Sequence, residues 1–105
     1  MKIKCTTEGR PEIYIPEKES LKSWIKEKGF KSIHHFFTGV MMLGADHDVD
    51  SVLEDIDAGD QVALVTGKQA GINFGHELAI ISNNKLELYD IGKITEEDIE
   101  LLEVK

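Results

Sequence analysis

Residues 77–89 read ELAIISNNKLELY, two apolar runs on either side of a pair of asparagines. Each run has the length of a β-strand, and asparagine accepts the positive φ angles that a tight turn between antiparallel strands requires. The sequence therefore predicts a β-hairpin with its turn at residues 82–85. A buried strand is predicted before it at residues 61–65, where the sequence reads QVALV.

The chain before this hairpin contains further strand signals. Loose alternation predicts strands at residues 1–7 and 12–15. The stretch 33–45 is apolar almost throughout, and two strands joined near Thr38 and Gly39 fit it best, with a buried helix as the alternative. In all, we expect about six to seven short strands.

Three segments have apolar residues at helical spacing. The first begins at Pro16 and ends at Gly29, the second begins with Asp48 as N-cap, and the third begins at Thr95 with a variant of the capping box. The order of strands and helices predicts a single α+β domain over residues 1–105, in which three helices cover one face of a mostly antiparallel sheet.

The composition places this domain inside the cell. No run approaches the roughly 18 apolar residues of a membrane helix, and Met1 is not followed by the apolar stretch of a secretion signal. Cys5 is the single cysteine, so no internal disulfide can form, and a cytoplasmic location is expected. The net charge of −8 argues against nucleic acid or an anionic membrane as the main partner, because both are negatively charged.

The charge is divided unevenly along the chain. Residues 1–31 hold eight Lys or Arg against five Asp or Glu, whereas residues 32–105 hold four against fifteen. This division predicts an accessory protein that binds another protein through charge complementarity. The partner-binding residues would be Lys18, Lys22 and Lys26, which line one helix face at four-residue steps. The alternative is an ordinary solvated surface; whether the chain is a monomer or a homodimer is left open.

The second charge feature is a carboxylate-rich segment. Asp46, Asp48 and Asp50 alternate as the first ligands of a calcium loop do, and they are the candidate site for calcium or another divalent cation. Two departures make the match incomplete: Ser51 stands where such loops need glycine, and Asp57 stands where they need glutamate. The helical spacing of the apolar residues favours a capped helix, which leaves at most a low-affinity site.

The histidines suggest a second kind of metal site. His34 and His35 are neighbours on a predicted strand, so their side chains point to opposite faces and cannot share a metal. His47 lies between Asp46 and Asp48, and this mixed set of nitrogen and oxygen ligands would suit zinc, nickel or iron. The alternative is a hydrogen-bonded structural role.

An enzyme is the least favoured interpretation. The loop at residues 66–75 carries a lysine but lacks the phosphate-binding motif and a following helix. Gly59-Asp60 before one strand and Gly75-His76 before the next resemble the pattern around the strand that carries the histidine of papain-like amidases. This resemblance implies a Cys/His hydrolase using His76. Cys5, however, lies in a predicted strand, where a small buried side chain is expected, and not at the helix N-terminus that activates such a thiol.

Overall fold

One mixed β-sheet and two α-helices make up the part of the chain that the computed structural model describes, residues 1–7, 13–36, 44–65, 77–92, 94 and 96–102. The strands are β1 (Ile3–Thr7), β2 (Ile13–Pro16), β3 (Ser32–Phe36), β4 (Gly44–Asp48), β5 (Gln61–Val65), β6 (Glu77–Ser82), β7 (Lys85–Asp90) and β8 (Ile99–Leu101). The helices are α1 (Lys18–Lys28) and α2 (Val49–Ala58), and η1 (Glu96–Asp98) is a short 3₁₀ turn. The predicted α+β class is confirmed. Within the described ranges, no helix has the length and apolar content needed to cross a membrane.

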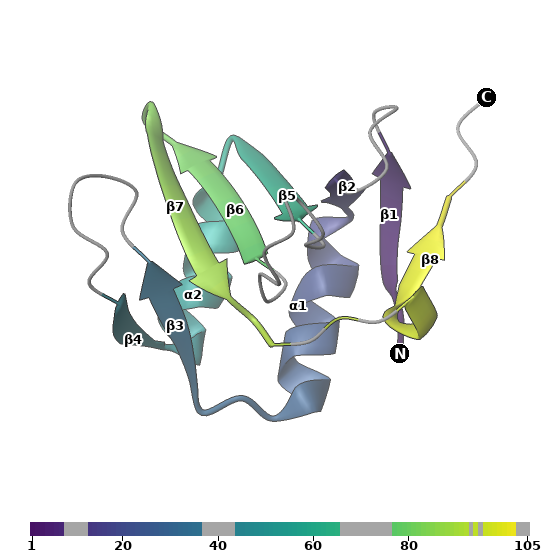
Figure 1. Cartoon of the computed structure of the whole chain (residues 1–105), viewed down its shortest axis with the longest axis horizontal. Helices are drawn as coiled ribbons and strands as arrows, with labels where there is room; N and C mark the ends of the chain where they lie inside the picture. Colours follow the sequence, from purple (N-terminus) through teal and green to yellow (C-terminus); the bar gives the residue numbers. More distant parts are fainter. Residues whose placement is uncertain (8–12, 37–43, 66–76, 93, 95, 103–105) are drawn as a thin grey trace, which may run out of the picture.

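The sheet has the strand order β4-β3-β7-β6-β5-β2-β1-β8 (Figure 1). Neighbouring strands are antiparallel except for β1 and β8, which run parallel. The predicted hairpin is β6–β7, and its turn residues Asn83 and Asn84 have φ angles of 52° and 62°, as a tight hairpin turn requires. Because β7 also pairs with β3, residues 88–90 do not form an open sheet edge.

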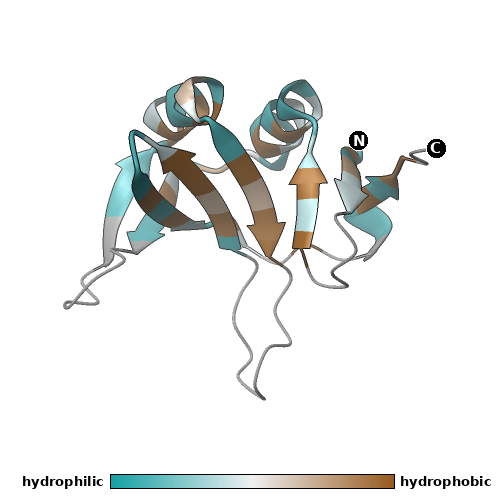
Figure 2. Ribbon diagram, turned by 90° about the horizontal axis from the view of Figure 1, so that it is seen from above, coloured by the Kyte–Doolittle hydropathy of each residue, from teal (hydrophilic) through white to brown (hydrophobic). Residues whose placement is uncertain are grey.

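The hydrophobic core lies between one face of the sheet and the two helices, both of which pack on the same side (Figure 2). Helix α1 buries Leu21, Trp24 and Ile25, and helix α2 buries Val52, Leu53 and Ile56. Each such side chain contributes about 1.5–3 kcal/mol when it leaves water. The strands contribute their inward residues: Ile3, Cys5, Ile33, Val62, Leu64, Leu78, Ile80 and Tyr89.

Two glycines shape the ends of the helices, for different reasons. Gly29 ends α1 in the left-handed region, with φ of 73°, as predicted. Gly59 ends α2 in an extended conformation, so its backbone would suit any residue. It is glycine because of close packing: a Cβ atom at Gly59 would lie 2.8 Å from Cγ2 of Ile80.

The prediction of a third helix is wrong. Residues 96–98 form only the η1 turn, and the chain then continues as β8, which pairs with β1 through Ile3↔Ile99 and its neighbours. A helix of about eight residues is marginal in water without strong packing, whereas the edge of β1 offers backbone hydrogen bonds, such as that from Leu102 N to Cys5 O at 2.8 Å. The described part of the chain therefore has eight strands and two helices, not six to seven strands and three helices; Thr95 lies outside it.

The tight packing at Gly59 leads to a prediction about stability. Replacing Gly59 by alanine should destabilise the protein by about 1–3 kcal/mol, because the new methyl group forces Ile80 or the end of α2 to move. Urea unfolding followed by Trp24 fluorescence measures this loss. The exposed substitution Ser51→Ala in α2 is the control and should stay within about 0.5 kcal/mol of the unmodified protein. An equal effect of the two substitutions would contradict the packing argument.

Candidate functional site

The three aspartates of the predicted cation site are divided between a strand and the start of a helix. Asp46 belongs to strand β4, where its carboxylate lies 3.1 Å from Nδ1 of His34. Asp48 occupies the N-cap position of α2 without a side-chain capping hydrogen bond, and Asp50 is exposed in the first turn. Among the described residues, no group of three His, Cys, Asp or Glu side chains is arranged to hold a metal ion. The binding of calcium or of a transition metal here stays a prediction.

Two of the three lysines predicted to contact a partner are engaged within the protein. Lys18 Nζ donates a hydrogen bond to the carbonyl oxygen of Gly59 at 2.8 Å. Lys22 Nζ binds both carboxylate oxygens of Asp57 at 2.9 Å, and the hydrogen bond to Asp57 raises the pKa of Lys22 above its ordinary value. Lys26 is exposed. Lys18 and Lys22 therefore hold α1 against the end of α2, so partner binding through this helix face remains an untested prediction.

The structure describes Cys5, but not His76, of the two residues in the hydrolase hypothesis. Cys5 is 1% exposed in the middle of β1, and burial raises its pKa to about 11. A thiol with such a pKa is almost entirely protonated at neutral pH and is a poor nucleophile. His76 and the loop at residues 66–75 lie outside the described residues. Cys5 is thus a small buried core residue, as the strand pattern indicated.

Two histidines and a tyrosine meet on the inner face of the sheet, at its β4 end. His35 on β3 is 5% exposed and stacks on Tyr89 of β7, with 4.6 Å between ring centroids. His47 on β4 lies edge-on to both rings, and its Nε2 is 3.1 Å from Nδ1 of His35. In a hydrogen bond between them, one nitrogen donates its N–H and the other, unprotonated nitrogen accepts. At least one of the two imidazole rings must therefore be neutral.

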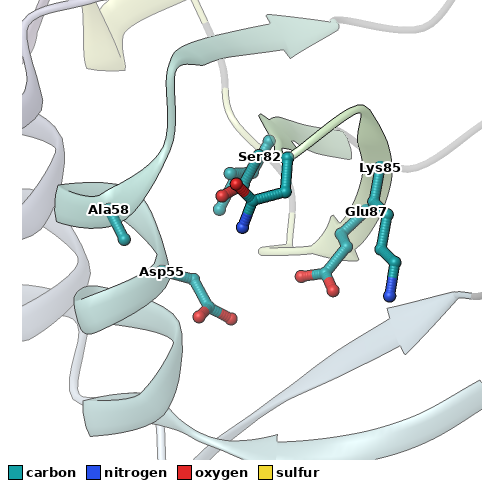
Figure 3. Close-up of a pocket in the computed structure, with 7 residues that line it drawn as sticks. Asp55, Ala58, Ser82, Lys85 and Glu87 are labelled. Carbon is teal, nitrogen blue, oxygen red and sulfur yellow. The ribbon is translucent and has the colours of Figure 1, made fainter.

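Two carboxylates contact the hydroxyl group of Tyr89, one of them from helix α2. The hydroxyl oxygen of Tyr89 lies 2.6 Å from Oδ2 of Asp55 and 2.9 Å from Oε2 of Glu87. Burial, together with these two contacts, raises the pKa of Tyr89, so the phenol stays protonated. In Figure 3 the Asp55 and Glu87 side chains extend into a hollow of about 170 Å³ beside the β6–β7 turn. Ligand sites usually measure about 300–1,000 Å³, so this hollow is small for a metabolite.

The outer face of the sheet, which we call the open face, is the face opposite α1 and α2. No helix or strand in the described ranges covers it (Figure 2). Residues paired across antiparallel strands share a face of the sheet. The strand registers therefore show which residues belong to the open face. Its apolar patch consists of Ile13, Ile15, Ala63, Val65, Ala79, Ile81, Leu86 and Leu88. All eight side chains are partly or fully exposed, with Ile81 at 37% and Leu86 at 42%.

The apolar patch contains a shallow hollow of about 270 Å³. Its apolar walls come from Ile15, Ala63, Ala79 and Ile81 of the open face and from the buried residues Pro16 and Val62. The small alanines on β5 and β6 leave space between the larger side chains. Lys18, Asp60 and Gln61 also line the hollow.

An acidic row runs beside the apolar patch on the same face. Glu77 of β6 lies directly opposite Asp90 of β7, Asp90 lies opposite His34 of β3, and His34 lies opposite Asp46 of β4. Burial raises the pKa of Glu77 above its ordinary value, and the nearby charge of Asp90 adds to the effect. The two features together make the open face both apolar and negatively charged.

Sequence reasoning missed both the open face and the histidine cluster. Apolar residues at both even and odd positions of QVALV predict a strand buried on both faces. In the structure Val62 and Leu64 are buried, whereas Ala63 and Val65 on the other face are partly exposed. The two predicted strands in residues 33–45 put His34 and His35 on opposite faces, and this is confirmed. That His47 and Tyr89 would lie against His35 depended on strand order, which local patterns do not contain.

The buried position of His35 predicts a loss of stability in mild acid. Burial, and next the neighbouring His47 ring, lower the pKa of His35 below its ordinary value of 6.5. Just below pH 6.5 the unfolded chain binds a proton there that the folded chain does not, so the free energy of unfolding falls as the pH drops.

Urea unfolding at about pH 7.5 and about pH 5.5 measures this loss. The substitution His35→Phe, which keeps a ring against Tyr89, should reduce the loss, whereas the exposed substitution Ser51→Ala in α2 should leave it unchanged. If His35→Phe leaves the loss as large as in the unmodified protein, the assignment to His35 is wrong.

No protein-family model matches the chain, and no curated protein and no solved structure matches it either.

Proposed function

We propose that this protein is an accessory protein that binds another protein through the open face of its sheet. The observation that carries the proposal is the apolar character of β5 and β6 on both of their faces. Val62, Leu64, Leu78 and Ile80 face the helices, while Ala63, Val65, Ala79 and Ile81 form the centre of the apolar patch. Antiparallel sheets with one solvated face normally carry polar residues there. Contiguous apolar surface of this kind is typical of an interaction site.

The charge of the open face supports a partner of opposite charge. Glu77, Asp90 and Asp46 lie beside the apolar patch, and the whole chain carries a net charge of −8. A partner surface with apolar side chains flanked by Lys or Arg complements both properties. A second copy of this chain would bring another −8 to the same interface, so a different protein is the better partner. The same charges repel nucleic acid.

The hollow in the apolar patch supports a protein as the ligand. Its volume of about 270 Å³ is below the usual range for small-molecule sites. Protein interfaces are often centred on one or two large apolar side chains that enter shallow pockets on the partner. A single Leu, Phe or Trp side chain of the partner could lie against Ala63 and Ala79 and contact Ile81, which lines the same hollow.

The experiment begins with a displayed library of random peptides selected on the intact protein. The expected result is enrichment of peptides with one large apolar residue flanked by Lys or Arg, because such peptides match the apolar patch and its negative surroundings. The strongest peptide is then titrated into isotope-labelled protein, and the amide NMR signals that move are expected at residues 63, 79 and 81. Recovery of no binder, or of acidic binders, counts against the proposal.

Two matched variants locate the binding surface. Ile81→Asp places a charge in the apolar patch and should weaken the selected peptide by at least roughly tenfold, equivalent to about 1.4 kcal/mol. Leu101→Asp makes the same chemical change at another exposed residue, 59% exposed on β8, and should leave binding unchanged. Light scattering on both variants and on the unmodified protein tests for a second copy. A dimer that Ile81→Asp dissociates would show that the patch binds another copy of this chain.

A further inference from the structure

We infer that the partner places a lysine or arginine side chain between Glu77 and Asp90, close to the apolar side chain that enters the hollow. This inference rests on the proposed function and specifies the chemistry of the partner. It concerns the junction between the acidic row and the apolar patch, where two carboxylates of the same sign face each other across neighbouring strands.

The Glu77 and Asp90 pair is unfavourable in the unbound protein. Like charges placed directly opposite on antiparallel strands destabilise the sheet. In the described part of the chain, neither carboxylate forms an ion pair with a basic side chain. Asp90 is held in place by a hydrogen bond that its Oδ1 accepts from the backbone N–H of Gly92 at 2.8 Å. A cation bound between the two carboxylates would remove their repulsion.

The surroundings of Glu77 make the gain from such a cation larger than at an open surface. Glu77 is partly buried, and burial, followed by the charge of Asp90, raises the pKa of its carboxyl group. Burial and the charge of Asp90 both disfavour the ionised carboxylate of Glu77. A positive charge from the partner would favour it. In the complex a basic side chain would therefore hold Glu77 ionised.

The distance between the hollow and the acidic pair limits where the basic residue lies in the partner. Ala79 lines the side of the hollow nearest to Glu77, which is two residues away on the same face of β6. At about 3.4 Å per residue, the shortest separation along the strand is about 7 Å. Residues i and i+2 of an extended segment have the same spacing, and residues i and i+4 of a helix come close to it at about 6 Å. A partner segment that meets this minimum carries its basic residue two positions from its apolar anchor if it is extended, or four positions away if it is helical.

The test uses synthetic peptides with one Trp and a Lys two or four positions away, compared with peptides in which norleucine replaces that Lys. Norleucine keeps the aliphatic chain and removes the charge. The Lys peptide is expected to bind at least roughly tenfold more tightly than the norleucine peptide, as interfacial charge pairs commonly contribute. In the double variant Glu77→Gln/Asp90→Asn this difference should disappear.

Two controls separate a local ion pair from general attraction. The double variant Asp48→Asn/Asp50→Asn removes the same amount of charge at the start of α2 and should keep the preference for the Lys peptide. Lowering the pH toward 4.5, the ordinary pKa of a glutamate, should weaken the Lys peptide more than the norleucine peptide, because Glu77 becomes neutral. In the absence of peptide, Glu77→Gln should stabilise the protein by removing the repulsion.

The results distinguish this inference from the proposed function. If both peptides bind equally, and Ile81→Asp still abolishes binding, the open face binds a partner but the inference about Glu77 and Asp90 is overturned. If Ile81→Asp has no effect on either peptide, the proposed function itself fails. A preference for the Lys peptide that the Asp48→Asn/Asp50→Asn control also removes would show that only the net charge matters.

Discussion

The contact between two helical apolar stripes and one face of the central strands is the interaction on which the rest of this structure depends. Trp24 of α1 and Ile56 of α2 are almost completely buried against that face, together with Leu64 and Leu78 of the strands. Because the helices use only one face, the alternation of side chains along β5 and β6 sends the remaining apolar residues to the other face. The apolar patch is thus a direct consequence of where the helices pack.

The same packing determines what the charged residues do. Lys22 binds Asp57 and Lys18 binds the carbonyl of Gly59, so part of the basic face of α1 holds the two helices together. The segment from Asp46 onward is divided between a strand and a helix, so Asp46 and Asp50 belong to different elements. The acidic row of the open face instead combines residues from β4, β6 and β7. Binding by this protein would therefore rely on residues distant in the chain.

The difference between the predicted third helix and the observed strand β8 shows how a local signal can be overruled. Ile99 and its neighbours have spacing that suits either a short helix or a strand. The free edge of β1 offers them backbone hydrogen bonds and lets Ile99 pack against the core. An isolated helix of that length gains too little from its own hydrogen bonds to compete. Such a choice depends on which edge is available nearby, and this information is absent from a local window.

The sequence by itself determined the local elements with strong signals. These include the β6–β7 hairpin with its asparagine turn, helix α1 with Gly29 at its end, helix α2 with its apolar stripe, and the burial of Cys5. Periodicity and turn chemistry act over a few neighbouring residues, and so they can be recognised without a structure. Only the tertiary structure decided the strand order, the face that the helices cover, the meeting of His35 with His47 and Tyr89, and the opposition of Glu77 to Asp90. These depend on contacts between distant segments, which are set by how the whole chain buries its apolar surface.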